Sequence, residues 1–244
     1  MEKGICISDL HYPQHSKPCL KIVLEFLEDF QPSTFVMNGD MLDLSCISHW
    51  NNGKPKRVEN KRLLKDYQGF QEDVLNPIED ILPDDCKKIF IYGNHENRVK
   101  RYTETYSTLT GIVELENNLS LDNYEIIDYN KHYNITPNFL IIHGLYTTEF
   151  HTKKTLSVYN CNVSYGHIHK QQSYTRTSVI DKTPLKATSM GCLCNLNPDY
   201  RNNQPSGWTH GFMYWYKEGN NIYDYYPMIV KKKCIINGVM YPKS

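Results

Sequence analysis

Short apolar segments of this chain end abruptly in side chains that carry oxygen or nitrogen donors. The clearest is KKIFIYGNHE, residues 87–96, where a run suited to a buried strand stops at Gly93, Asn94, His95 and Glu96. An amide, an imidazole and a carboxylate are costly to bury unless something pairs with them. The segment therefore predicts either a strand that presents polar groups to a ligand, or a simple turn.

The spacing of apolar residues predicts strands that alternate with helices over the first two-thirds of the chain. Strands are expected at 4–8, 34–38, 89–92, 139–142 and 163–165, and helices at 18–30 and 63–81, with a kink at Pro77 and a stop at Pro83. This alternation favours a largely parallel sheet that is buried on both faces.

The last third of the chain has a different pattern. After Gly166 the helical spacing disappears, and the segments YTRTSVI, LKATSM and GFMYWYKEGNNIYDYYPMIV predict antiparallel strands, with a Gly-Asn-Asn turn inside the last segment. We expect one domain, residues 1–244, built from two sheets.

Charge, hydropathy and cysteine usage narrow the class of protein. The chain has 27 lysines and arginines and 27 aspartates and glutamates, so its net charge is zero. The molecule as a whole therefore does not attract nucleic acid or an anionic membrane electrostatically. No apolar run approaches the roughly 20 residues of a membrane span, and the N-terminus MEKGICISDLHY lacks a signal-peptide pattern. We therefore expect a cytoplasmic protein with no membrane partner. The scattered cysteines indicate reduced, mostly buried thiols, which we favour over metal binding at Cys192 and Cys194.

Polar side chains follow each of five predicted strands. Because the carboxyl ends of parallel strands lie along one edge of a sheet, five separate segments are expected to meet there. A turn explains any one of them as well as a ligand does, and a lone histidine is more often a core or surface residue. Five in succession are not explained by turns. In chain order they carry Asp9 and His11; Asp40 and Asp43; Asn94, His95 and Glu96; His143; and His167 and His169.

The donor types indicate a metal centre. Carboxylate, imidazole and amide oxygen without thiolate favour manganese, iron, zinc or nickel over magnesium or calcium. Two ions are expected, because one ion would leave several of these buried groups unmatched. With two aspartates and a hydroxide, two divalent ions leave a formal charge of about +1, which attracts phosphate. Such ions also lower the pKa of bound water towards roughly 7.

As a combination, these segments resemble the calcineurin-like metallophosphoesterases. The matching motifs are D-x-H at Asp9 and His11, G-D-x-x-D at 39–43, G-N-H-E at 93–96, H-G at His143, and G-H-x-H at 166–169. The resemblance implies a four-layer α/β/β/α sandwich of two mixed sheets with flanking helices. It also implies phosphoester hydrolysis by a hydroxide that two metal ions activate, with manganese the expected metal.

The same resemblance implies a role for each residue. One ion would be held by Asp9, His11, Asp40 and His169, and the other by Asp40, Asn94, His143 and His167, with Asp40 bridging. His95 would protonate the leaving oxygen or fix the phosphate, and Asp43 would orient its imidazole.

Three residues are candidate substrate contacts. Segment 45–62 is interpreted as a lid in which Trp50 stacks on a base and Arg57 contacts phosphate; the alternative is a solvated loop. Arg98 is placed to reach a phosphate, or else lies on a basic helix face. Leu44 and Ser45 follow Asp43 where protein serine/threonine phosphatases of this superfamily have Arg-Gly, which disfavours a phosphoprotein substrate.

The leading interpretation is a phosphodiesterase that acts on a nucleotide-like substrate. One alternative is a nuclease for DNA or RNA, against which the balanced charge is a mild argument. Another is a non-catalytic scaffold that keeps the fold, which the complete ligand set disfavours.

Overall fold

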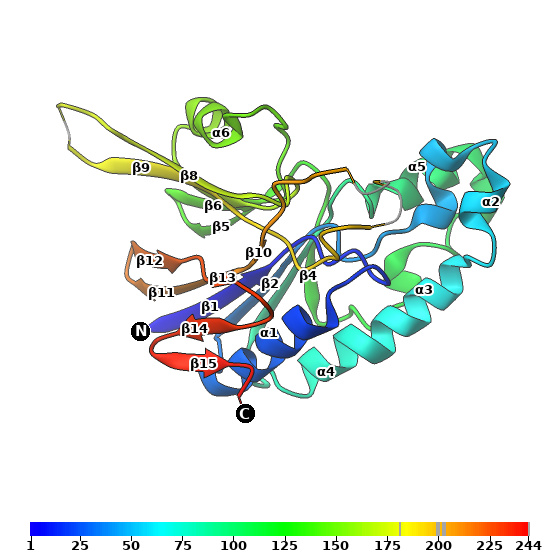
Figure 1. Cartoon of the computed structure of the whole chain (residues 1–244), viewed down its shortest axis with the longest axis horizontal. Helices are drawn as coiled ribbons and strands as arrows, with labels where there is room; N and C mark the ends of the chain where they lie inside the picture. The colour runs from blue at the N-terminus through cyan, green and yellow to red at the C-terminus, as the bar shows by residue number, and fades with distance from the viewer. Residues whose placement is uncertain (181, 199–200, 202–203, 244) are drawn as a thin grey trace.

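Two mixed β-sheets face each other, and helices cover the outer face of each (Figure 1). The computed structural model describes residues 1–180, 182–198, 201 and 204–243. The architecture is the four-layer α/β/β/α sandwich that the sequence motifs implied.

The first sheet has the strand order β12-β11-β1-β2-β3-β4. Strands β1 to β4 run parallel, whereas β11 pairs antiparallel with both β1 and β12. The N-terminal strand therefore lies beside a strand from near the C-terminus. The bounds are β1 (Glu2–Ile7), β2 (Thr34–Asn38), β3 (Lys87–Ile91), β4 (Tyr124–Ile127), β11 (Met213–Glu218) and β12 (Asn221–Tyr225).

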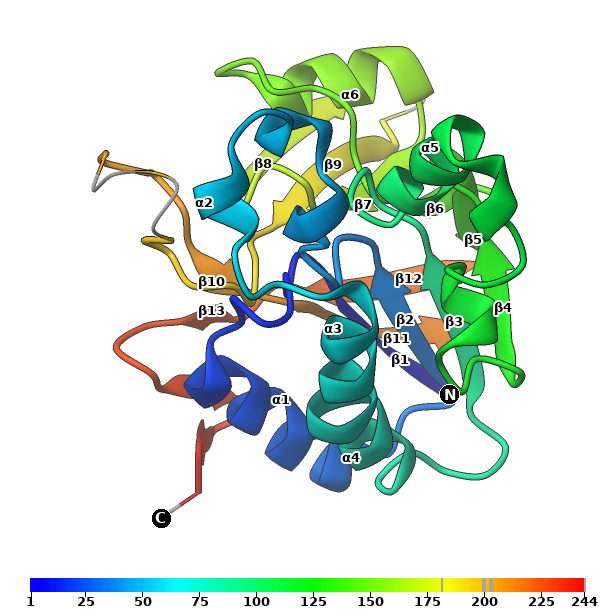
Figure 2. The same ribbon diagram turned by 90° about the vertical axis from the view of Figure 1, so that its right-hand side faces the viewer.

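Helices α1 (Lys17–Phe30), α3 (Leu63–Phe70) and α4 (Asn76–Glu79) lie on the outer face of this sheet (Figure 2). A π-helical turn, Gln71–Leu75, joins α3 to α4. It lies just before Pro77, which has no N–H to donate and whose ring crowds the carbonyl four residues earlier. The irregularity thus falls next to the proline at which the sequence predicted a kink.

The second sheet has the order β5-β6-β7-β9-β8. Strands β6, β7 and β9 are parallel, and β5 and β8 are antiparallel edge strands. Helix α6 (His151–Tyr159) covers its outer face. The bounds are β5 (His132–Thr136), β6 (Phe139–Ile142), β7 (Asn162–Tyr165), β8 (Gln171–Thr177) and β9 (Pro184–Met190).

The expectation of an antiparallel final third is only partly correct. Hairpins β8–β9 and β11–β12 are antiparallel, but β9 also pairs parallel with β7, and β11 joins the first sheet. Pairing between distant segments, which local periodicity does not encode, decides this arrangement.

Alternate residues of the central strands enter different layers of the core. Ile5 and Ile7 of β1 pack with the outer helices, whereas Cys6 lies between the two sheets. In β3, Phe90 faces the helices and Ile89 lies between the sheets. Because each large apolar side chain contributes roughly 1.5–3 kcal/mol when fully buried, these two-sided strands stabilise the sandwich strongly.

Shorter elements lie around the two sheets. The predicted lid, 45–62, contains η1, η2 and α2, and η1 contacts α5. Among the described residues, every helix falls short of the length and apolarity needed to cross a bilayer. The bounds are η1 (Ser45–Ile47), η2 (His49–Asn51), α2 (Pro55–Val58), α5 (Asn97–Thr105), η4 (Ser107–Leu109), η5 (Leu115–Asn117), β10 (His210–Gly211), β13 (Met228–Ile229), β14 (Cys234–Ile236) and β15 (Val239–Tyr241).

Candidate metal centre

The five polar segments converge where parallel strands of the two sheets end. They follow β1, β2 and β3 of the first sheet and β6 and β7 of the second. Within this site three sets of donor atoms each lie within 4.8 Å of one another: Asp9, His11 and His169; Asp40, His143 and His167; and His11, Asp43 and His95.

Several of these residues adopt left-handed backbone conformations. The φ angle is 55° at Asp9, 54° at His11, 52° at Asp40, 67° at His167 and 60° at His169. A non-glycine residue in this region carries a conformational cost, so the surrounding structure must hold it there. Such clustered strain is typical of a functional site.

Two motif glycines allow the segments to approach closely. A Cβ atom on Gly93 would lie 2.2 Å from Asp40 Oδ1, and one on Gly166 would lie 1.9 Å from Ser8 Oγ. Both separations are far inside van der Waals contact. Glycine at these positions therefore lets each loop close over the aspartate of its neighbour.

The first donor group surrounds an unpaired oxygen. Asp9 Oδ2 accepts hydrogen bonds from Ser8 Oγ at 2.7 Å and the His167 N–H at 2.8 Å. Asp9 Oδ1 lies 3.1 Å from His169 Nε2 and 4.0 Å from His11 Nε2. It is buried and has no hydrogen-bond partner among the described residues. A divalent cation would satisfy this oxygen and both imidazoles, so the residues present fit the expected group.

The second donor group lies around Asp40. Its Oδ2 is 3.3 Å from His143 Nε2, which is 3.2 Å from Asn94 Oδ1. The same Oδ2 is 3.8 Å from His11 Nε2 in the first group. The other nitrogen of His143 lies 2.8 Å from the Asn38 carbonyl oxygen, which fixes the ring. Asp40 therefore sits between the two groups, as a bridging ligand must.

Carboxylates and imidazoles perturb one another's pKa values in this site. Burial lowers the pKa of His169, but the negative charge of the adjacent Asp9 carboxylate outweighs burial and raises the pKa to about 10. Burial also lowers the pKa of His143, but the nearby Asp40 carboxylate outweighs burial and raises the pKa of His143 to about 9. Burial and the charge of His143 lower the pKa of His167 to about 4. Cation binding would release protons from such groups, so metal affinity is expected to fall in acid.

The sequence match agrees with this geometry. A family model described as calcineurin-like phosphoesterase matches residues 4–178, which include every predicted metal ligand. The chain belongs to the calcineurin-like phosphoesterase family. Membership implies metal-dependent phosphoester hydrolysis at a dinuclear site, and the Asp and His groups described above provide the donors.

The individual proteins that this chain resembles are distant in sequence. The Gene 54 protein of Mycobacterium phage D29 is 25% identical over 234 residues, which covers 89% of this chain and 90% of the phage protein. The Gene 54 protein of Mycobacterium phage L5 is 23% identical over 232 residues, with the same coverage of 89% and 90%. Vacuolar protein sorting 29 from Cryptosporidium parvum has a TM-score of 0.50 at 13% identity, covering 98% of this chain and 94% of that chain. At such identity the likeness shows the fold alone.

His95 of the phosphoesterase lies at the edge of the two donor groups. Its Nδ1 is 2.8 Å from the Asp43 carbonyl oxygen and 3.4 Å from Asp43 Oδ1, while its Nε2 is 3.8 Å from Asp40 Oδ2. A guanidinium nitrogen of Arg98 lies 2.8 Å from the same Nε2. Asp43 thus contacts the imidazole of His95, and the Arg98 side chain lies against the same ring.

Glu96 has a structural position. Its Oε2 accepts the backbone N–H of Asp40 and of Gly93, each at 2.8 Å, and its Oε1 accepts that of Leu42 at 3.1 Å. The carboxylate therefore ties the Asp40 loop to the G-N-H-E turn from behind the site. The sequence motif assigned Glu96 no separate role, and these contacts give it a structural one.

A groove with a volume of about 310 Å³ lies between segment 46–52 and α5, and its lining includes Arg98, which contacts His95. Lid residues and one face of α5 line it: Cys46, Ile47, His49, Asn52, Arg98, Arg101, Tyr102, Thr105 and Tyr106. Trp50 and Arg57 are not among them. Trp50 is 68% exposed with its ring against His49, and Arg57 is exposed on α2. Besides Arg98, the groove is therefore lined by Tyr102, Thr105 and Tyr106, which the sequence did not single out.

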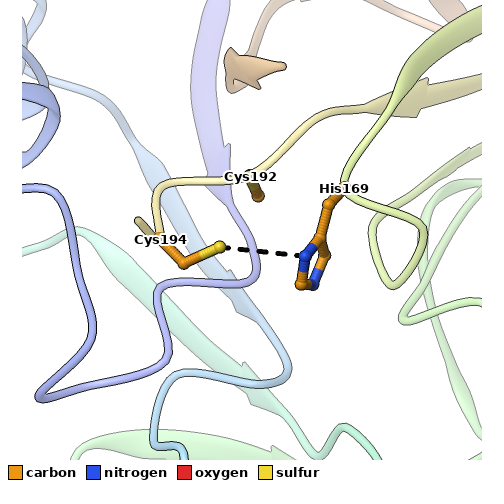
Figure 3. Close-up of side chains that lie close together, drawn as sticks. All are labelled: His169, Cys192 and Cys194. Carbon is orange, nitrogen blue, oxygen red and sulfur yellow. Dashed lines mark hydrogen bonds between the residues drawn. The ribbon is translucent and has the colours of Figure 1, made fainter. Parts of the chain in front are cut away.

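Sequence reasoning also missed the surroundings of His169. Cys194 Sγ lies 3.8 Å from His169 Nδ1, and Cys192 Sγ belongs to the same buried group (Figure 3). Trp208 packs edge-on against the imidazole, with ring centroids 4.2 Å apart. The Cys-x-Cys spacing was the available signal, but nothing local related it to a histidine 25 positions away. All eight cysteines are free thiols.

Proposed function

We propose that this phosphoesterase hydrolyses phosphodiester bonds in a nucleotide-like substrate. The observation that supports the proposal best is the convergence, from five separate segments, of seven donor side chains on one largely buried centre beside a cationic groove. The donors are Asp9, His11, Asp40, Asn94, His143, His167 and His169.

Two groups of side chains would each hold one divalent ion. Asp9, His11 and His169 form one group, Asn94, His143 and His167 form the other, and Asp40 is shared between them. Manganese suits this donor set, as do iron, zinc and nickel. When bound, the ions would supply an activated water and positive charge that offsets the phosphoryl oxygens.

His95 would deliver a proton to the leaving oxygen. Its Nδ1 donates to the Asp43 carbonyl oxygen at 2.8 Å, which fixes the plane of the ring. Its Nε2 accepts from Arg98 at 2.8 Å. A substrate phosphate competes for the Arg98 guanidinium, because charge-assisted bonds to phosphate are the stronger ones. When Arg98 binds the phosphate instead, Nε2 would take up a proton from solvent, and the resulting imidazolium would donate that proton to the leaving oxygen.

The groove supports a nucleotide-like substrate. Arg98 and Arg101 offer guanidinium groups for phosphate, and no carboxylate is among the lining residues. Tyr102 and Tyr106 present phenol rings with centroids 4.8 Å apart, on which a base can stack. A ligand with both an anionic and a planar part matches this lining.

Hydrolysis of bis-p-nitrophenyl phosphate with added Mn²⁺ tests the proposal, with p-nitrophenyl phosphate measured beside it. We expect faster cleavage of the diester, and loss of activity in both Asp40→Ala and His95→Ala. If manganese-loaded protein cleaves neither ester, nor nucleotides or nucleic acids, the proposed function is wrong.

A second comparison separates the nucleotide-like substrate from polymers. Cyclic nucleotides and dinucleotides would be compared with labelled DNA and RNA across a salt series. Preference for the small substrates supports the proposal. Exclusive cleavage of polymers, with a steep loss of rate as salt rises, would identify a nuclease. Near-zero metal occupancy after loading would favour a scaffold.

A further inference from the structure

The imidazole of His169 is enclosed on several sides. Its Nε2 faces Asp9 Oδ1 and His11 Nε2, each at 3.1 Å. Its Nδ1 faces Cys194 Sγ at 3.8 Å, within hydrogen-bonding distance for sulfur, and Figure 3 shows the Cys194 side chain directed at the ring. The indole of Trp208 packs against it with centroids 4.2 Å apart. The ring therefore has little freedom to turn.

The position of Cys194 is itself fixed by the loop that follows β9. The backbone N–H of Leu193 donates to the Asp9 carbonyl oxygen at 3.1 Å. The side chain of His210 donates through Nε2 to the Cys194 carbonyl oxygen at 2.8 Å. Only 3% of Cys194 is exposed. These contacts hold the sulfur beside Nδ1 and tie it to the loop that carries Asp9.

Cys192 lies two residues away in the same buried group, but its thiol makes a different hydrogen bond. Its thiol donates to the Thr209 carbonyl oxygen at 3.5 Å. Figure 3 shows the dashed contact to His169 from Cys194 and none from Cys192. Cys192 is equally buried, so it provides a matched control for any effect of removing a sulfur atom from this region.

A histidine that binds a cation through Nε2 carries its ring proton on Nδ1, and that N–H needs an acceptor. The acceptor is commonly a carboxylate or a backbone carbonyl. We propose that Cys194 is a positioning residue for the metal centre: its sulfur accepts the Nδ1–H of His169 and fixes the tautomer that presents Nε2 to the cation beside Asp9 and His11. This inference rests on the proposed function, since it assumes that His169 is a metal ligand.

Titration of the full chain with manganese, with the heat of binding measured by calorimetry, tests this role. Cys194→Ala should weaken the binding of one of two ions by about 10–100-fold and leave the other unchanged. Cys192→Ala should bind both ions as the wild type does. Cys194→Ser should recover part of the lost affinity, because a hydroxyl oxygen also accepts the Nδ1–H. Melting temperatures of the metal-free variants establish whether each one folds.

The outcomes are distinct. Unchanged affinity in a folded Cys194→Ala variant, or equal weakening of both ions, would overturn the positioning role. Binding of a third ion that both cysteine substitutions abolish would also overturn it, since the thiols would then be ligands themselves. If the affinities change as expected but the wild type cleaves no phosphoester, the proposed function fails and the positioning role stands.

Discussion

The Glu96 carboxylate accepts the backbone N–H of Asp40 at 2.8 Å, although the two residues lie 56 positions apart. Glu96 is 1% exposed and also accepts the N–H groups of Gly93 and Leu42. Its amide counterpart would turn an NH₂ towards one of these donors. We expect Glu96→Gln to lower the free energy of unfolding by about 1–3 kcal/mol, measured by denaturant titration. Full stability with loss of turnover would instead indicate a direct catalytic role.

Gly93 is expected to tolerate no side chain. In Gly93→Ala the new Cβ would lie 2.2 Å from Asp40 Oδ1, so the aspartate must move away from its position between His11 and His143. We expect loss of bound manganese and of activity, measured by elemental analysis and diester hydrolysis. Gly111→Ala is the control. Its φ of +82° makes the substitution unfavourable for the backbone, but the new Cβ would have no atom within 4 Å, so activity should persist.

Asp66 is expected to make stability depend on pH. Burial, together with the charge of Asp43, raises its pKa from 3.8 to about 6. Because the folded value lies above the unfolded one, ionisation of Asp66 costs stability, and this cost grows as pH rises through that window. Asp66→Asn should therefore raise the melting temperature by a few degrees at neutral pH and hardly at all below pH 3.8. An equal rise at both pH values would contradict this. Asp84→Asn, at an exposed position, serves as the control.

Arg98 and Arg57 are expected to differ in kinetics. Arg98 lines the groove and contacts His95, whereas Arg57 lies exposed outside it. Arg98→Ala should lower kcat/KM about 10–100-fold, the range for a lost charge-assisted hydrogen bond, and Arg57→Ala should leave kcat/KM unchanged. Steady-state kinetics on the diester would measure both. A comparable loss of kcat/KM in Arg57→Ala would instead support the predicted contact between Arg57 and the substrate phosphate.

Local patterns in the sequence predicted the family and the fold of this protein. Each donor follows an apolar run, and the alternation of strands with helices predicted a parallel sheet buried on both faces, in which the consecutive residues Ile5, Cys6 and Ile7 of β1 are all buried. Strand ends and motif glycines are local features, so they can be read from neighbouring residues alone.

Tertiary structure alone decided what surrounds those donors. It inserted β9 between β7 and β8, brought Cys194 to His169, and formed the groove along α5. The physical reason is the separation along the chain over which each kind of interaction acts. Strand periodicity and turn geometry arise among adjacent residues, whereas the direction in which an imidazole points depends on side chains that other segments supply after the whole chain has packed.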